Sequence, residues 1–264
     1  MAVFRKLSGT FSNPAGPPLV DWDQLFGADA RVVQWWDFHP SRVTVSGGTV
    51  SRVAPRKPGG TALVQAIAAK QPNFITSTAA LNGRPSLDFD QLSSVDVLVA
   101  ENNTIYPIAT DSTFVAILNP AVVASTTFIA GGGATATGLH LITNAISAGV
   151  GQLAQRVGTA GAQAAASSPA AKDTWHFGAW TYEKTAGQAA VSLNGLPFIL
   201  GTANPSAVIS DPTFALGAPA SGSGTSPTKW GFAMLLNVSL RTGNDDLLNH
   251  LKQYARDVFR LTVQ

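Results

Sequence analysis

Residues 174–200 read TWHFGAWTYEKTAGQAAVSLNGLPFIL, and this stretch decides the fold. From Trp175 to Trp180, residues alternate with the two-residue period of a β-strand, and the period returns over Ala190–Leu193. Asn194-Gly195 favours a type I′ turn, because both central positions of that turn need φ > 0. Pro197 opens a third strand, where its missing N–H matters least. The stretch predicts a three-stranded antiparallel meander, which must bury its apolar face against a second layer.

The composition bounds the class of protein. The chain has 264 residues, which suits one large all-β domain or two small ones. It is 45% hydrophobic and 12% charged. These values exclude a disordered chain, which would be rich in charge and poor in apolar residues. It has no cysteine, which excludes disulfides and thiolate metal sites and fits synthesis in a reducing cytoplasm.

Charge and hydropathy also limit the partners. The net charge is only +2, which is weak support for a nucleic-acid partner. The first residues, MAVFRKLS, lack the apolar run of a secretory signal. No window approaches the ~18 apolar residues that a membrane span needs. We therefore expect no nucleic-acid partner, no membrane span and no export through a signal peptide.

Strand patterns recur along the rest of the chain. Alternating or β-branched runs, bounded by glycine, proline and polar residues, predict strands. These lie at residues 32–37, 42–46, 49–53, 95–99, 112–118, 126–130, 139–143, 150–157, 213–217 and 229–240. Residues 63–68 fit either a strand or a short helix. In the last strand, one face is expected to carry Trp230, Phe232, Met234 and Leu236.

One helix is expected near the C-terminus, over Asn244–Leu261. Asn244 can cap it, acidic residues follow at the positive end of its dipole, and apolar residues recur at helical spacing. Residues 159–172 are rich in Ala, Gly and Ser and indicate a mobile surface loop, with a helix as the alternative. About a dozen short strands and one late helix indicate an all-β fold, a two-sheet antiparallel jelly-roll sandwich.

Residues 1–30 form a separate N-terminal extended arm in this interpretation, and residues 31–264 form the jelly-roll domain. The arm contains three prolines and one candidate strand near Val3–Phe11. Its large side chains would be poorly placed on a solvated tail, so we expect them to pack on the domain or on a partner chain. These anchor residues are Phe4, Phe11, Trp22 and Phe26.

A series of short motifs follows in one order along residues 31–261. They are Trp35-Trp36-Asp37, Thr49-Val50-Ser51 after a glycine turn, Gln71-Pro72, Asn82–Asp90, Val191–Gly195, Leu216-Gly217, Trp230-Gly231 and a helix with Leu251 and Tyr254. In this order they resemble the concanavalin A-like lectin/glucanase superfamily, in its laminin G-like branch. The resemblance implies a jelly roll of two antiparallel sheets.

The resemblance also implies a role. The laminin G-like branch occurs in surface adhesins, secreted modules and bacteriophage virion proteins, and this chain looks most like the bacteriophage group. It would then be a capsid decoration, fibre or tail protein, made in the host bacterial cytoplasm and found in the virion. Its partners would be other virion proteins, reached through the arm, and further copies of itself in a homotrimer. Its outer face would contact host-surface glycan.

The acidic residues argue against catalysis. Asp88 and Asp90 lie two apart on an expected strand, so their carboxylates share a face. Glycoside hydrolysis needs two carboxyl groups across the scissile bond. The Glu-x-Asp-x-x-Glu motif of the superfamily's glucanases is absent, so we predict no enzyme activity and no catalytic residue. Laminin G-like domains sometimes hold calcium; Asp88, Asp90 and Asp96 are the nearest candidate ligands, with solvated or capping roles as the alternative.

Five residues are predicted to form a glycan or subunit contact. In a strand, one of two adjacent aromatic residues must face away from the core, which favours Trp36 for the surface. The same argument selects Trp180 together with Tyr182. Arg56 and Lys57, in a basic loop, would meet an acidic glycan, with a solvated charged loop as the alternative.

Three functions follow from these observations. The first is a non-enzymatic structural and adhesion protein of a virion. The second is a soluble carbohydrate-binding module. The third is a glycoside hydrolase, which activity lost in Asp88→Asn or Asp90→Asn would support.

Overall fold

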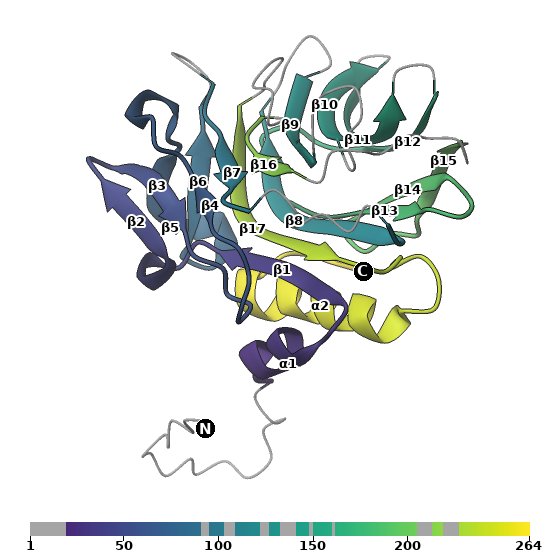
Figure 1. Ribbon diagram of the computed structural model, residues 1–264, viewed down its shortest axis with the longest axis horizontal. Helices are drawn as coiled ribbons and strands as arrows, with labels where there is room; N and C mark the ends of the chain where they lie inside the picture. Colours follow the sequence, from purple (N-terminus) through teal and green to yellow (C-terminus); the bar gives the residue numbers. More distant parts are fainter. Residues whose placement is uncertain are drawn as a thin grey trace.

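The computed structural model describes residues 20–90, 95–102, 109–121, 127–132, 141–147, 150–159, 162–204, 213–218 and 227–264. Within these ranges the chain forms strands β1–β17, helices α1 (Trp22–Ala28) and α2 (Asp245–Phe259), and three 3-10 turns (Figure 1). The turns are η1 (Pro40–Arg42), η2 (Ala68–Lys70) and η3 (Ala79–Leu81). All strand pairings are antiparallel, so the predicted all-β fold is confirmed. No helix of this part is long and apolar enough to cross a membrane.

The strands form two layers. One layer, which we call the helix-side sheet, contains β5 (Asn73–Thr78), β6 (Arg84–Phe89), β17 (Thr228–Leu236), β8 (Ser112–Pro120), β13 (His176–Glu183), β14 (Gln188–Leu193) and β15 (Ile199–Ala203), with β1 (Val32–Asp37) also on β17. The other, the outer sheet, contains β3 (Thr49–Val53), β4 (Leu63–Val64), β7 (Leu98–Ala100), β16 (Phe214–Leu216), β9 (Thr127–Gly132), β10 (Leu141–Ser147), β11 (Val150–Thr159) and β12 (Ala162–Pro169). Hairpin strand β2 (Val43–Ser46) extends β3.

The two sheets join at both edges. Thr49 of β3 pairs with Asn73 of β5, and Ala165 of β12 pairs with Thr202 of β15. The hydrogen bonding therefore runs continuously from one layer into the other. This arrangement leaves few open sheet edges, which would otherwise attract another chain.

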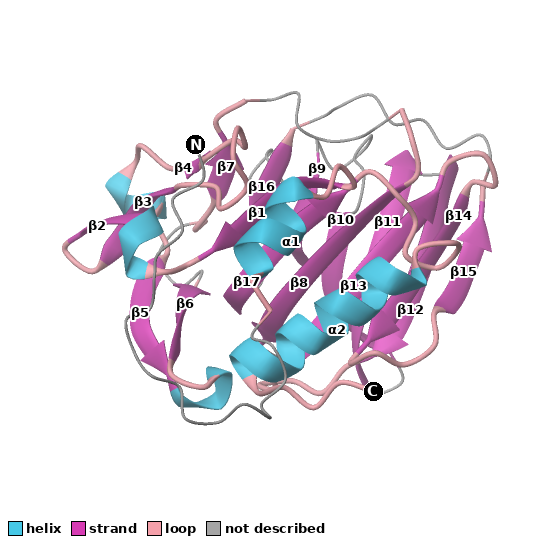
Figure 2. Cartoon of the chain, turned by 90° about the horizontal axis from the view of Figure 1, so that it is seen from below, coloured by secondary structure: helices cyan, strands magenta, loops and turns pink. Residues whose placement is uncertain are grey.

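The central strands of the helix-side sheet, β17, β8 and β13, are buried on both faces. Along β8, Phe114, Ala116 and Leu118 point into the core between the sheets, whereas Val115 and Ile117 point to the opposite face. That opposite face is covered by α2, which lies across the strands, and by α1 beside it (Figure 2). The molecule thus has three layers: outer sheet, helix-side sheet and helices.

The C-terminal helix prediction is confirmed. Helix α2 buries an apolar stripe against the helix-side sheet, and this stripe consists of Leu247, Leu251, Tyr254, Ala255 and Phe259. Asn244 occupies the N-cap position but does not cap with its side chain; its amide instead donates to the carbonyls of Ser239 and Thr242. The helix ends at Arg260, which adopts a left-handed conformation with φ of 58°.

The predicted meander is confirmed as β13–β14–β15. Asn194 and Gly195 both have positive φ, 52° and 75°, as the turn requires. The Asn194 carboxamide also accepts a hydrogen bond from the backbone N–H of Phe177, which connects the turn to β13, the first strand of the meander.

The loop predicted over residues 159–172 is wrong. Most of it is strand β12, which pairs with β11 from Thr159↔Ala162 to Gln152↔Pro169. Alanine and serine have little intrinsic preference for a strand, but pairing with neighbours outweighs that preference. A local composition rule could not detect a strand that its partner determines.

The predicted face of the last strand is also wrong in part. Phe232, Met234 and Leu236 face the helices, but Trp230 lies in the core between the sheets. The pairing with β8 shifts register between Trp230 and Phe232. Such a bulge inserts one extra residue, and an odd shift sends side chains to the other face.

The extended conformation predicted for residues 1–30 is wrong at Trp22–Ala28, whereas the expected packing of Trp22 and Phe26 on the domain is confirmed. Residues Trp22–Ala28 form helix α1, whose Phe26 is 0% exposed and packs on Trp35 and Tyr254. The folded body therefore includes this helix. Phe4, Phe11 and the strand predicted near Val3–Phe11 lie outside the described residues.

Candidate functional site: a polar cleft beside Asp37

The aromatic residues predicted for the surface are all buried. Trp36, Trp180 and Tyr182 lie in the core between the sheets, and each is at most 1% exposed. The prediction assumed that one face of the sheet meets solvent. It is wrong because helices cover that face, so that both alternating sets of side chains are buried.

Both side chains of the predicted basic contact loop have partners within the chain. The Arg56 guanidinium pairs with Asp23 and Asp37. The Lys57 ammonium donates to the carbonyls of Gly27 (3.2 Å) and Asp29 (2.9 Å), at the C-terminal end of α1, where a cation is favoured. Both side chains hold the helix in place and neither is a free surface charge.

The candidate calcium ligands do not gather. Asp88 Oδ2 lies 3.7 Å from the Lys229 ammonium, and Asp90 accepts a hydrogen bond from the Asn73 amide. Asp96 accepts one from the backbone N–H of Asp90. Calcium needs several converging oxygens. Across the part of the chain that the structure describes, no three or more His, Cys, Asp or Glu side chains form such a group.

A polar hollow lies at the end of β1. Its volume is about 280 Å³, and it is lined by Asp23, Asp37, His39, Ser41, Arg42, Arg56 and Arg84. A smaller cavity of about 10 Å³ shares Asp37, His39 and Arg84 with it and reaches Tyr254 and Gly231. That inner space holds roughly one water molecule. Together they form what we call the Asp37 cleft.

The cleft has a topological cause. Strand β17 pairs with β6 through residues 228–230 and with β1 through residues 232–236. The exchange of neighbours falls at the bulge near Gly231, which lines the inner cavity. Asp37 ends β1 and Arg84 begins β6, so the split in the sheet brings these two residues to one hollow.

Arg56 connects residues that line the cleft. Arg56 forms two hydrogen bonds with Asp23, at 2.6 and 3.0 Å, and one with Asp37 Oδ2 at 2.6 Å. It also donates to the Tyr254 hydroxyl at 3.2 Å. Burial works to lower the pKa of Arg56, but the hydrogen bond to Asp23 and the nearby negative charges raise it above its usual value. The same hydrogen bond lowers the pKa of Asp23, so both groups stay charged at neutral pH.

Two polar groups in the cleft have hydrogen-bonding capacity that no described residue uses. Asp37 is 7% exposed, and its Oδ1 accepts no hydrogen bond from any described residue; Arg42 Nε lies 3.7 Å from it. The half-buried guanidinium of Arg84 forms neither a hydrogen bond nor an ion pair with a described residue. A buried carboxylate oxygen without a donor is costly, which points to a partner from outside the chain.

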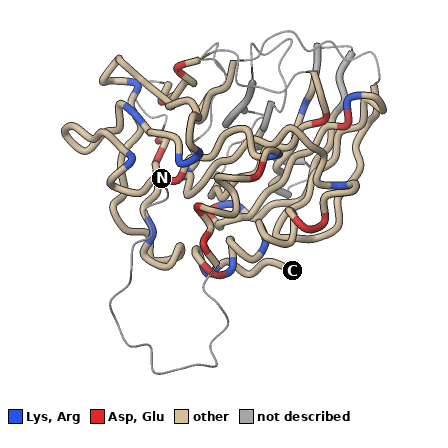
Figure 3. Tube along the Cα trace, turned by 60° about the horizontal axis from the view of Figure 1, so that its bottom comes forward, with Lys and Arg blue, Asp and Glu red and all other residues tan. Residues whose placement is uncertain are grey.

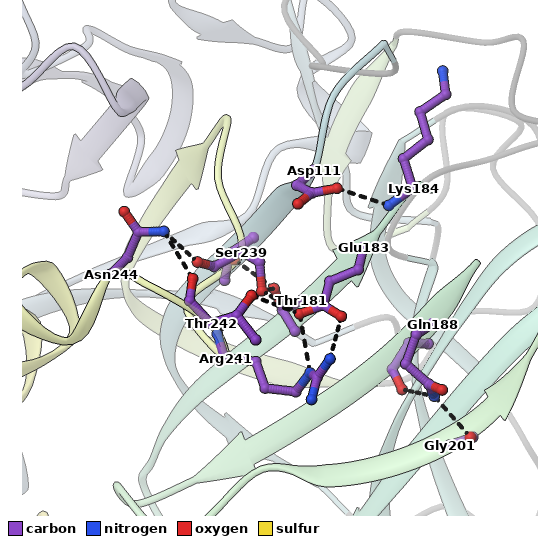
Figure 4. A network of polar contacts seen from close by, with 12 residues as sticks. Asp111, Thr181, Glu183, Lys184, Gln188, Gly201, Ser239, Arg241, Thr242 and Asn244 are labelled. Atoms are coloured by element: carbon purple, nitrogen blue, oxygen red, sulfur yellow. Dashed lines mark hydrogen bonds and ion pairs between the residues drawn. The ribbon is translucent and has the colours of Figure 1, made fainter. Parts of the chain in front are cut away.

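A second polar cluster, at the other end of the helix-side sheet, is closed on itself (Figure 4). Glu183 accepts hydrogen bonds from Ser239, Arg241 and Thr242. Burial works to raise the pKa of Glu183, but the hydrogen bond from Arg241 and the two hydroxyls lower it. This cluster fastens the loop after β17 and offers no free group to a ligand.

Acidic and basic positions are sparse and mixed along the described trace (Figure 3). The Asp37 cleft gathers five charged residues in one hollow, and these are Asp23, Asp37, Arg42, Arg56 and Arg84. Chemically, it offers a fixed acceptor and a fixed cationic donor within one small hollow, which suits a ligand that bears hydroxyl groups.

The sequence matches no protein-family model and no curated protein. The fold is similar to the crystal structure of the botulinum neurotoxin serotype G binding domain, with a TM-score of 0.57 at 8% identity, over 86% of this chain and 51% of that one. It is similar to the botulinum neurotoxin DC binding domain in complex with SialylT, with a TM-score of 0.52 at 9% identity, over 86% and 52%.

A third similar structure is Trypanosoma rangeli sialidase in complex with sialic acid, with a TM-score of 0.52 at 14% identity. It is matched over 87% of this chain and 34% of that one. The chain thus spans about half the length of the toxin domains and about a third of the sialidase. At these identities the similarity establishes a shared β-sandwich fold, as the resemblance to lectin-like jelly rolls implied.

Sequence reasoning missed the cleft. Asp37, His39, Ser41, Arg42 and Arg84 were not candidates. Arg56, which lines the cleft, was predicted to meet an acidic glycan, with a solvated loop as the alternative. One signal was present: Asp37 directly follows two tryptophans in a strand, and an aspartate at the end of a buried strand needs a partner for its charge.

Proposed function

We propose that this chain is a carbohydrate-binding module whose Asp37 cleft holds a sugar. The observation that carries the proposal is Asp37, which lines the cleft and whose buried Oδ1 has no hydrogen-bond donor among the described residues. A carboxylate oxygen can only accept hydrogen bonds, and a sugar hydroxyl is a neutral donor of suitable size. The similar sialidase and toxin domains whose structures contain sialic acid or SialylT support the same class of ligand.

Binding of the intact chain to a glycan array tests the proposal. The informative variant is Ser41→Trp, because Ser41 is exposed on the cleft wall and its replacement fills the hollow without touching the Arg56 ion pairs. Val45→Trp is the matched control, since Val45 is 41% exposed on β2 outside the cleft. We expect binding by the wild type and the control, and loss in Ser41→Trp. A wild type that binds no glycan, or equal binding by both variants, would overturn the proposal.

A second variant tests Asp37, the residue on which the proposal rests. Asp37→Asn keeps the shape of the side chain but replaces one of its two acceptor oxygens with an NH₂ donor. We therefore expect about tenfold weaker binding of the sugar. Because Asp37 also pairs with Arg56, thermal unfolding must show that the variant is folded at the assay temperature. A folded Asp37→Asn protein that binds like the wild type would place the sugar elsewhere.

The proposal is one of binding without catalysis. The hydrogen bond from Arg56 lowers the pKa of Asp23, whereas a general acid works best with a pKa near the working pH. One observation favours a hydrolase as the second candidate: burial raises the pKa of Asp88, although Lys229 lies beside it. Incubation with each bound glycan, followed by mass spectrometry, separates the two. Hydrolysis that disappears in Asp88→Asn would support the hydrolase.

We also propose that the module works on a bacteriophage particle, as a capsid decoration, fibre or tail protein bound to other virion proteins and to copies of itself. The support is the sequence resemblance. Attachment would use residues 1–19, because residues from Asp21 onward pack on the body. Deletion of residues 1–19 should then leave a folded, sugar-binding protein that no longer joins the particle. Normal incorporation of the shortened chain would contradict this attachment.

A further inference from the structure

We infer that the Asp37 cleft selects an acidic sugar, whose carboxylate or sulfate pairs with Arg84 while a neighbouring hydroxyl donates to Asp37 Oδ1. This inference rests on the proposed function and names the ligand class of the same site. It starts from the charges that line the cleft.

The three arginines of the cleft are not equivalent. Arg56 is taken up by Asp23 and Asp37 together. Arg42 lies 3.7 Å from Asp37 Oδ1 and donates to the carbonyl of Pro55 at 3.0 Å. These two cations balance the two carboxylates. The positive charge of Arg84 is therefore the one that remains uncompensated by the described residues that line the hollow.

Arg84 is well placed to bind an anion. It is the first residue of β6, directly after the tight turn at Asn82-Gly83 and before the buried Pro85, so its backbone is held by the sheet. It lines both the outer and the inner part of the cleft. Burial raises the pKa of Tyr254, and the positive charge of Arg84 is among those that oppose this rise, which places the guanidinium near the inner cavity. A planar guanidinium with five N–H donors matches a carboxylate in two parallel hydrogen bonds.

The acceptor and the cation together define the ligand. A simple anion would satisfy Arg84 but would bring no donor to Asp37 Oδ1, whereas a neutral sugar would leave Arg84 unpaired. A sugar with an acidic substituent satisfies both. At about 280 Å³, the hollow lies near the lower end of small-molecule sites, which suits one sugar ring.

The test uses glycans that differ in one group: a galactose-terminated chain, its sialylated form and its sulfated form. The wild-type protein should bind at least one acidic form about tenfold or more tightly than the neutral one, because hydrogen bonds to charged groups are the stronger ones. The preference should fall as salt is raised. The comparison of the carboxylate and sulfate forms identifies which anion the site takes.

Two variants assign the preference to Arg84. Arg84→Gln should bind the acidic and neutral glycans equally. It should remain as stable as the wild type, because the Arg84 guanidinium has no partner among the described residues. Arg52→Gln is the control, since Arg52 is 44% exposed and pairs with Glu101 outside the cleft. If neutral and acidic glycans bind the wild type equally, or if Arg84→Gln keeps the preference, the inference fails and the proposed function stands. If no glycan binds, the proposed function fails.

Discussion

The guanidinium of Arg56 lies over the indole of Trp35, 4.3 Å from the ring centroid. Trp35 belongs to β1, and the partners of Arg56 come from α1, from the end of β1 and from α2. One side chain therefore connects the helices to the sheet at the floor of the Asp37 cleft. Its ion pairs hold the carboxylate of Asp37, whose other oxygen is the proposed acceptor for a sugar hydroxyl.

Removal of this connection should destabilise the protein. Arg56→Leu leaves Asp37 buried without its close partner, and breaking a buried pair in this way costs about 3 kcal/mol or more. Urea unfolding gives the change in free energy. Arg52→Leu is the matched control, because its pair with Glu101 is exposed to solvent and such pairs contribute little to stability. Equal losses in the two variants would show that Arg56 is an ordinary surface residue.

Trp35 and Trp36 show what a local pattern determines. Alternation correctly assigned the two rings to opposite faces of β1, and the structure places Trp36 between the sheets and Trp35 under the helices. The alternation did not establish that one face of β1 is exposed to solvent. That face is covered by α2, which lies far along the chain. The meander and the terminal helix could be predicted because they depend on residues that are close in the sequence. The exposure of a sheet face could not be predicted, because it depends on distant parts of the chain.

The cleft was out of reach for a related reason. Arg56 contacts Asp23, Asp37 and Tyr254, which lie 33, 19 and 198 positions away in the sequence. In the sequence, Arg56 is part of a short basic run, the usual mark of a solvated loop. Only the fold brings the carboxylates to it, and only the bulge in β17 opens the hollow beside them.

Gly178 makes room for a tryptophan. A Cβ at this position would lie 2.2 Å from the Trp180 ring on the same strand. Gly178→Ala should therefore cost about 1–3 kcal/mol, because an overpacked core must shift side chains or backbone. Gly27→Ala is the control: its nearest neighbour would be 3.6 Å away, and alanine is favoured over glycine in a helix by roughly 1 kcal/mol. The midpoint of thermal unfolding should fall in Gly178→Ala and rise in Gly27→Ala.

Stability should fall in acid through Asp246. The hydrogen bond from Arg31 lowers its pKa to about 2, from an ordinary value of 3.8. Since the folded-state pKa is the lower one, this contribution is complete above pH 3.8 and is lost as the pH falls toward 2. Asp246→Asn should lower the midpoint of thermal unfolding at pH 6 and flatten its decline below pH 4. Asp257→Asn, on the exposed side of α2, serves as the control. A pH profile unchanged in Asp246→Asn would contradict the assignment.

Phe26 decides whether helix α1 belongs to the folded body. Its ring lies 5.3 Å from Trp35 and 5.5 Å from both Trp22 and Tyr254, and it is fully buried. Phe26→Ala should cost about 3–5 kcal/mol, as truncation of a buried aromatic does. Val20→Ala, at a position 39% exposed, should change stability by less than about 0.5 kcal/mol.

The same variant also tests how α1 serves the cleft. Helix α1 carries Asp23, so its loosening frees one partner of Arg56 and weakens the hold on Asp37. We therefore expect Phe26→Ala to weaken sugar binding even under conditions where the sheets remain folded, and amide hydrogen exchange should show α1 losing protection before β8 or β13. If α1 and the sheets lose protection together, the helix is an inseparable part of the core; if Phe26→Ala leaves both stability and binding unchanged, α1 belongs to an arm after all.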